Sequence, residues 1–195
     1  MRKIKKANRR ACSIEVSPLT TAIKYELLLP TEMGNHADTH CFRKNFIVLD
    51  CTHQKCSVAT FLVEHDKTQE IDIVTSATAV DLKDGSTIVY VFGRGLWFGD
   101  CMEKSLINPN QCRHYRVSLC DDPTDPHRPL SIRKERFSIP MEIFNSRCGF
   151  EPRHLTLEEL EACPRITLSD TKSWDPERVS FQVSSLKDEW RTCHD

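Results

Sequence analysis

The segment from residue 34 to residue 40 holds side chains that could carry out acid–base chemistry. It reads Gly-Asn-His-Ala-Asp-Thr-His, which places one carboxylate, one hydroxyl and two imidazoles within seven residues. A loop carboxylate can activate water when a second carboxylate shares its proton, because one group then acts as the base and the other as the acid. Since the chain has a single segment of this kind, such chemistry would require two chains to meet.

The elements that must position this segment are mostly strands. An Asp-Gly pair at residues 84–85 separates two runs rich in β-branched residues, which predicts a β-hairpin. Pro30 ends the strand that precedes the candidate segment. Strands are predicted, in chain order, over residues 22–29, 46–49, 71–74, 77–82, 87–92, 96–98, 115–120 and 137–141.

Two short helices are predicted. Pro109 suits the first turn of a helix that runs to about residue 114. Thr156 and Glu159 have the spacing of a capping box, which predicts a helix over about 156–163 that ends before Pro164. Residues 121–131 hold three prolines and predict a loop.

These elements predict a mainly β protein, with a small closed β-barrel and a C-terminal helical appendage. We expect a basic, flexible arm over residues 1–20, the β domain over 21–145, and a tail over 146–195. The tail is expected to contain one short helix and an irregular segment.

The net charge of −1 hides an asymmetry. Residues 1–10 carry +6, and residues 11–195 carry −7 from 21 basic and 28 acidic residues. The basic arm predicts a weak contact with nucleic-acid phosphates. The residues expected to make it are Arg2, Lys3, Lys5, Lys6, Arg9 and Arg10.

No apolar run approaches the length of a membrane-spanning helix, so no membrane contact is expected. The basic N-terminus lacks the apolar region of a secretory signal, which predicts an intracellular protein, cytoplasmic or nuclear, that is not secreted.

The ten cysteines contain no C-x-x-C pair. Five residues within a span of 17 could ligate a metal, but their spacing matches no common zinc site, so buried thiols are favoured and zinc stays the alternative. They are His40, Cys41, Cys51, His53 and Cys56. The chain has no glycine-rich phosphate loop and no H-E-x-x-H or G-x-S-x-G motif, so we expect no metal and no cofactor.

Several longer motifs carry a family resemblance. The chain resembles a family of retroelement-derived proteins of the diatom and fungal type, which is similar to the aspartic protease region of copia-type retrotransposon polyproteins. The resemblance covers roughly residues 30–180. Its motifs here are H-A-D-T within 34–39, L-W-F-G at 96–99, S-L-I-N-P-N-Q at 105–111, C-D-D-P at 120–123 with D-P-H-R at 125–128, and W-D-P at 174–176.

The resemblance implies a retropepsin-like barrel with an active-site-like loop, and the chain departs from the pattern within that loop. Gly34 stands at the expected catalytic Asp position, and a glycine cannot activate water. The rest of the loop is formed by Asn35, His36, Ala37 and Thr39, with Asp38 as the anchoring carboxylate.

A second register, that is, a second alignment of the loop with the protease motif, would keep a catalytic carboxylate. It takes Asp38-Thr39-His40 as a variant of the D-T-G turn and makes Asp38 the catalytic residue. An imidazole then occupies the position where a tight turn favours glycine. The favoured interpretation is therefore a degenerate, inactive aspartic protease domain.

If active, the domain would cleave a peptide or polyprotein substrate as a homodimer. The alternative is a non-catalytic module of a retroelement polyprotein that binds protein or nucleic acid.

Overall fold

The computed structural model describes residues 29–58 and 69–181, and within them the chain is mainly β. The strands are β1 (Thr31–Met33), β2 (Cys41–Arg43), β3 (Ile47–Val58), β4 (Gln69–Asp81), β5 (Thr87–Gly99), β6 (Leu106–Ile107), β7 (Ser118–Cys120), β8 (Ser131–Lys134), β9 (Phe137–Pro140), β10 (Glu142–Phe144), β11 (Arg147–Phe150) and β12 (Arg165–Ser169). The helices are α1 (Pro109–His114) and α2 (Leu157–Ala162), and neither six-residue helix could cross a bilayer.

The strands form two sheets. The larger sheet has nine strands in the order β10-β11-β1-β6-β2-β5-β4-β3, with β12 paired to β5 in parallel, and the smaller sheet has the order β7-β8-β9. Within the described residues, the two ends of the larger sheet, β3 and β10, do not pair with each other. The prediction of a mainly β fold is confirmed, whereas the prediction of a closed barrel is wrong.

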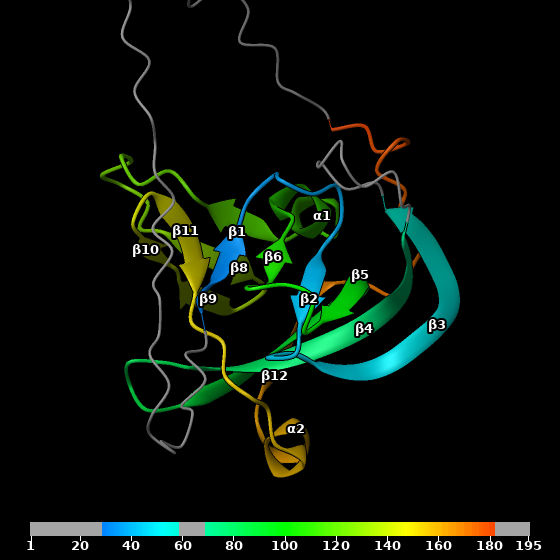
Figure 1. The fold of residues 1–195 in the computed structure, drawn as a ribbon. Coiled ribbons are helices and arrows are strands. Elements are labelled where there is room, and N and C mark those ends of the chain that lie inside the picture. The colour runs from blue at the N-terminus through cyan, green and yellow to red at the C-terminus, as the bar shows by residue number, and fades with distance from the viewer. Residues whose placement is uncertain (1–28, 59–68, 182–195) are drawn as a thin grey trace, which may run out of the picture.

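The hairpin predicted from Asp84-Gly85 is present as β4 and β5 (Figure 1). Gly85 has a φ of +83°, a conformation that residues with a side chain rarely adopt. The Leu82 N–H donates to the Ser86 carbonyl at 2.8 Å and closes the turn. The residues of this turn therefore determine the antiparallel pairing of β4 with β5.

β5 is longer than the sequence pattern suggests, because Leu96, Trp97 and Phe98 continue it instead of forming a separate strand. The glycines within it mark places where other groups come close. A Cβ atom at Gly95 would lie 2.0 Å from the Phe42 ring, and one at Gly93 would lie 2.4 Å from the Asp170 carbonyl oxygen. The absence of side chains at these two positions therefore lets β2 and the end of β12 pack closely against this half of β5.

The sheet continues past residue 145, where the sequence analysis places the start of a tail. β11 pairs with β1, and β12 pairs with the first half of β5. α2 lies between these two strands in the chain, and its capping box is formed by Thr156 and Glu159 as predicted. The helical appendage is therefore followed by a strand of the main sheet and is not terminal.

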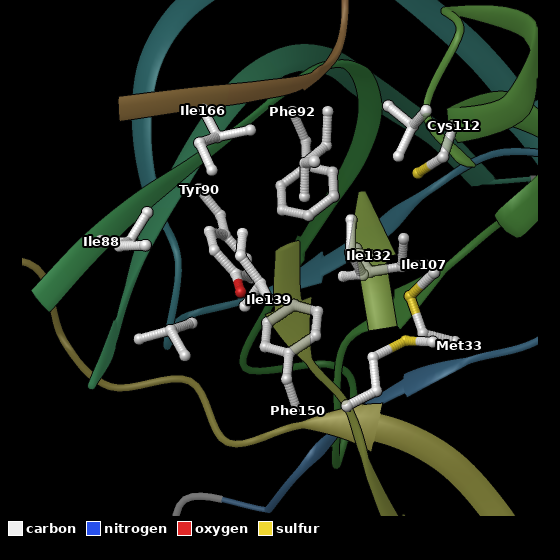
Figure 2. Packing of buried hydrophobic residues seen from close by; sticks show 14 of the residues in the cluster. Met33, Ile88, Tyr90, Phe92, Ile107, Cys112, Ile132, Ile139, Phe150 and Ile166 are labelled. Carbon is white, nitrogen blue, oxygen red and sulfur yellow. The ribbon is translucent and has the colours of Figure 1, made fainter. Parts of the chain in front are cut away.

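The core is formed by residues of both sheets (Figure 2). Tyr90 and Phe92 from β5 face Phe150 from β11, and Ile132 and Ile139 come from the small sheet. The ring centroids of Tyr90 and Phe150 are 5.0 Å apart in an edge-to-face contact, a favoured aromatic geometry. Both sheets thus share one hydrophobic cluster.

The close approach at Gly95 yields a stability prediction. Gly95→Ala should lower the free energy of unfolding by about 1–3 kcal/mol, because its methyl group would overlap the buried Phe42 ring. Gly34→Ala is the matched control, since its Cβ would come closest to the exposed His36 side chain, which can move. Urea denaturation of both variants is the measurement, and equal stabilities of the two would contradict the prediction.

Candidate functional site

The candidate loop, residues 34–40, connects β1 to β2 (Figure 1). β6 lies between these two strands, parallel to β1 and antiparallel to β2. The Gly34 N–H donates to the Ile107 carbonyl at 3.0 Å, so the start of the loop is tied to the end of β6. The loop therefore passes over the point where β6 leads into α1.

Asn108 holds the loop against α1. Its side-chain oxygen accepts from the N–H groups of Asn110 and Gln111 and caps the helix, and its amide nitrogen donates to the Ala37 carbonyl at 2.6 Å. Pro109 follows at the first helical position, where it loses no helical hydrogen bond. The helix predicted over 109–114 is thus confirmed, and its cap also positions the loop.

His40, at the end of the loop, is completely buried and satisfied at every polar atom. Its ring Nδ1 accepts from the Asn108 backbone N–H at 3.0 Å, and its Nε2 lies 3.0 Å from the Ser169 hydroxyl. Its backbone N–H donates to the Gln111 side chain at 2.9 Å, and its carbonyl accepts from Leu96 at 2.8 Å. We call His40, Asn108, Gln111 and Ser169 the buried polar hub.

The hub also defines which nitrogen of His40 carries the proton. Because Nδ1 accepts a hydrogen bond, Nε2 is protonated and donates to Ser169. The Ser169 hydroxyl in turn donates to the Gly93 carbonyl at 3.0 Å, and the Gln111 amide donates to the carbonyls of Gly93 and Arg94. Burial lowers the pKa of His40 to about 3, so the ring stays neutral at physiological pH.

The His40–Ser169 pair cannot work as a nucleophile and base. Its Nε2 already carries a proton, and the serine directs its own proton to a backbone carbonyl. Both residues have no exposed surface, so a substrate cannot reach them. His40 instead braces the end of the loop through these hydrogen bonds.

The other predicted site residues lie towards solvent. Asn35, His36 and Asp38 are exposed, and Ala37 and Thr39 are partly buried. The Trp174 indole N–H donates to the Asp38 carbonyl at 3.0 Å and to the Thr39 hydroxyl at 3.1 Å. The W-D-P segment noted in the sequence therefore lies across the loop.

Sequence reasoning missed Glu32, a carboxylate two residues before Gly34. It is only 5% exposed, and its oxygens contact His36 at 3.1 Å, Arg147 at 3.0 Å and Lys104. Burial opposes its ionisation, but the hydrogen bond from Lys104 and the charges of Lys104, Arg147 and His36 hold its pKa below the usual range. A cavity of about 370 Å³ lies beside it. No local spacing signals this site, because Lys104 and Arg147 are remote in sequence.

The proposed metal ligands are not arranged for a metal. Within residues 29–58 and 69–181, no group of three or more His, Cys, Asp or Glu side chains could hold an ion. Burial raises the pKa of the Cys41 thiol to about 12, and both His40 ring nitrogens are occupied. Burial likewise raises the pKa of Cys112 to about 12, so this thiol is not reactive.

The loop over residues 121–131 is rich in turns, as predicted. Asp122 accepts from the N–H and hydroxyl of Thr124, and Asp125 accepts from the His127 N–H and from Arg128. These carboxylates are therefore engaged in the loop itself. The basic residues of the arm, Arg2 to Arg10, lie outside the described residues.

The buried neutral state of His40 predicts an acid-sensitive stability. The ring binds a proton in the unfolded chain near pH 6.5 but in the folded chain only near pH 3, so stability is present above pH 6.5 and falls as the pH drops below it. The free energy of unfolding should decrease by about 2 kcal/mol between pH 6.5 and about 5.

The control for this prediction is a second histidine. His40→Gln should abolish the pH-dependent loss, whereas His127→Gln, at an exposed position, should retain it. Denaturant titrations at several pH values measure both. A loss of the same size in His40→Gln would show that another group is responsible.

Comparisons of this chain with family models, with curated proteins and with solved structures found no match.

Proposed function

We propose that this chain is a retropepsin-like domain of retroelement origin that has lost its catalytic carboxylate and serves as a non-catalytic module. One observation carries the proposal: the loop that would bear the carboxylate is rigidly positioned between β1 and β2, and its first residue is Gly34. The loop geometry is kept by backbone and buried side-chain bonds that do not require a side chain at position 34.

Position 34 offers space for the missing side chain. A Cβ atom there would lie 2.9 Å from the exposed His36 ring, which can move, and 3.4 Å from a Glu32 oxygen. The nearby Glu32 carboxylate does not substitute for an aspartate, because Lys104 and Arg147 neutralise it. A carboxylate engaged by two cations is a poor base towards water.

Asp38 does not meet the requirements of the second register. A catalytic D-T-G turn uses its threonine hydroxyl to brace the loop and glycine to turn tightly. Here the Thr39 hydroxyl accepts from Trp174, and the third residue is His40, whose ring points into the buried polar hub. These contacts favour an inactive domain over catalysis by Asp38.

Restoring the acid tests the proposal. The assay uses peptides of the chain's own sequence near pH 5, where an aspartic dyad is half-protonated. The purified chain should not cleave these peptides. The Gly34→Asp variant should gain pepstatin-sensitive cleavage as a homodimer. Gly34→Asn is the matched control, because it adds the same bulk without an acid and should stay inactive. Thermal unfolding verifies that each variant is folded.

Two results would count against this proposal. Pepstatin-sensitive cleavage by the unchanged chain that disappears in Asp38→Asn would assign catalysis to Asp38. A folded, dimeric Gly34→Asp variant without cleavage would contradict the retropepsin-like interpretation of the loop.

The charge of the N-terminus favours a second candidate function, contact with nucleic acid. Residues 1–10 hold six basic and no acidic residues. Such a segment binds phosphates with an affinity that falls steeply with salt. Deletion of residues 1–10 should reduce a salt-dependent gel shift by at least about tenfold in affinity, and a shift that is unchanged by the deletion or by salt would exclude the arm.

A further inference from the structure

Most cations in the described residues are paired with an acid, and several of those without a carboxylate partner lie around the β8–β9 turn and the adjoining β12. Exposed lysines elsewhere, such as Lys83 and Lys172, lie within 4 Å of Glu142 and Asp170. Lys134, Arg136 and Arg165 have no carboxylate of the described residues at ion-pairing distance. Unpaired cations on one surface indicate a site for an anionic partner.

Two of these cations line one hollow, and the third lies beside its wall. The hollow has a volume of about 150 Å³ and lies between the β8–β9 turn and β12. The Lys134 ammonium donates to the Thr167 carbonyl, which fixes it at the rim with two further N–H groups free to donate. Arg165 contributes a second cation to the lining. The residues that line the hollow are Lys134, Glu135, Phe137, Arg165, Ile166 and Thr167.

The wall of the hollow is partly aromatic. Phe137 lies directly opposite Lys134 in the β8–β9 ladder, and the Arg136 guanidinium lies 5.3 Å from the centroid of its ring. Ile166, which is buried, forms the adjoining apolar surface. A volume of about 150 Å³ is enough to hold a benzene ring, so the hollow is large enough for one planar ring.

This surface stays positively charged when its one acidic residue is counted, so it favours an anionic partner. Three cations against Glu135 leave a net charge of +2. Phosphates recruit clustered arginine and lysine side chains, and unpaired bases stack on aromatic rings and on guanidinium groups. A duplex keeps its bases stacked inside, and a lipid headgroup brings no planar base.

We propose that the hollow and its three cations form a docking surface for single-stranded nucleic acid. The phosphates pair with the cations, and one unstacked base occupies the hollow beside Phe137. The residues of this surface are different from those of the N-terminal arm and from those of the loop at 34–40. The proposal therefore stands whether or not Gly34→Asp gains protease activity.

The test uses the full-length chain, with its arm intact, and fluorescence anisotropy of a labelled uridine oligonucleotide of about ten residues. The double variant Arg136→Ala/Arg165→Ala should weaken binding about tenfold and reduce the salt slope by about 1.4, because each phosphate that a cation no longer neutralises lowers the slope by about 0.7. The matched control Lys83→Ala/Lys172→Ala removes the same charge from weakly paired lysines and should weaken binding less than about twofold.

A third variant separates base stacking from charge. Phe137→Leu keeps the apolar bulk and all cations, and it should weaken binding about tenfold without altering the salt slope. A duplex of the same length and anionic phospholipid vesicles should bind more weakly than the oligonucleotide, with no difference between unchanged chain and Phe137→Leu.

Three results would overturn the proposal. One is an equal loss of affinity in the two double variants, and another is the absence of oligonucleotide binding by the unchanged, folded chain. The last is binding to the duplex or to vesicles that is as tight as binding to the single strand and equally sensitive to Arg136→Ala/Arg165→Ala.

Discussion

The imidazole of His40 joins parts of the chain that are far apart in sequence. It accepts from the Asn108 backbone, 68 residues away, and donates to the Ser169 hydroxyl, 129 residues away. Ser169 continues the connection to the Gly93 carbonyl, where Gln111 also donates. The candidate loop, α1, β5 and β12 thus meet at one set of buried hydrogen bonds. An unsatisfied member of such a set would carry a large desolvation cost, so these elements form together.

This hub positions the loop through hydrogen bonds that require no catalytic group. The hub holds the loop from its inner side, and Asn108 and Trp174 hold the carbonyls of Ala37 and Asp38. None of these bonds involves a side chain at position 34. Under the proposed function, a glycine there takes the place of the catalytic aspartate while the bonds that hold the loop are kept. The neutral, buried His40 supports structure and performs no proton transfer.

The features that sequence could predict are those encoded by neighbouring residues. The hairpin at Asp84-Gly85, the helix that begins at Pro109 and the capping box at Thr156 each depend on a few adjacent positions. The parallel pairing of β12 with β5, the open ends of the sheet and the ion pairs of Glu32 depend on residues more than 70 positions apart. Gly95 shows the same limit, since it lies between the predicted strands 87–92 and 96–98 but is part of β5, where it makes room for the Phe42 ring. In the candidate site, residue types indicated which side chains lie in the loop, but not which of them would be buried.

The protonation state of His40 shows whether the buried polar hub holds the loop through the hydrogen bonds described. Nitrogen-15 NMR of the imidazole, recorded from about pH 7.5 to about pH 5, reports both the tautomer and any titration. The spectra should show a neutral ring with the proton on Nε2 and no titration in that range, because burial lowers the pKa to about 3. A ring that titrates near pH 6.5, or one with its proton on Nδ1, would contradict the hydrogen bonds through which the loop is held.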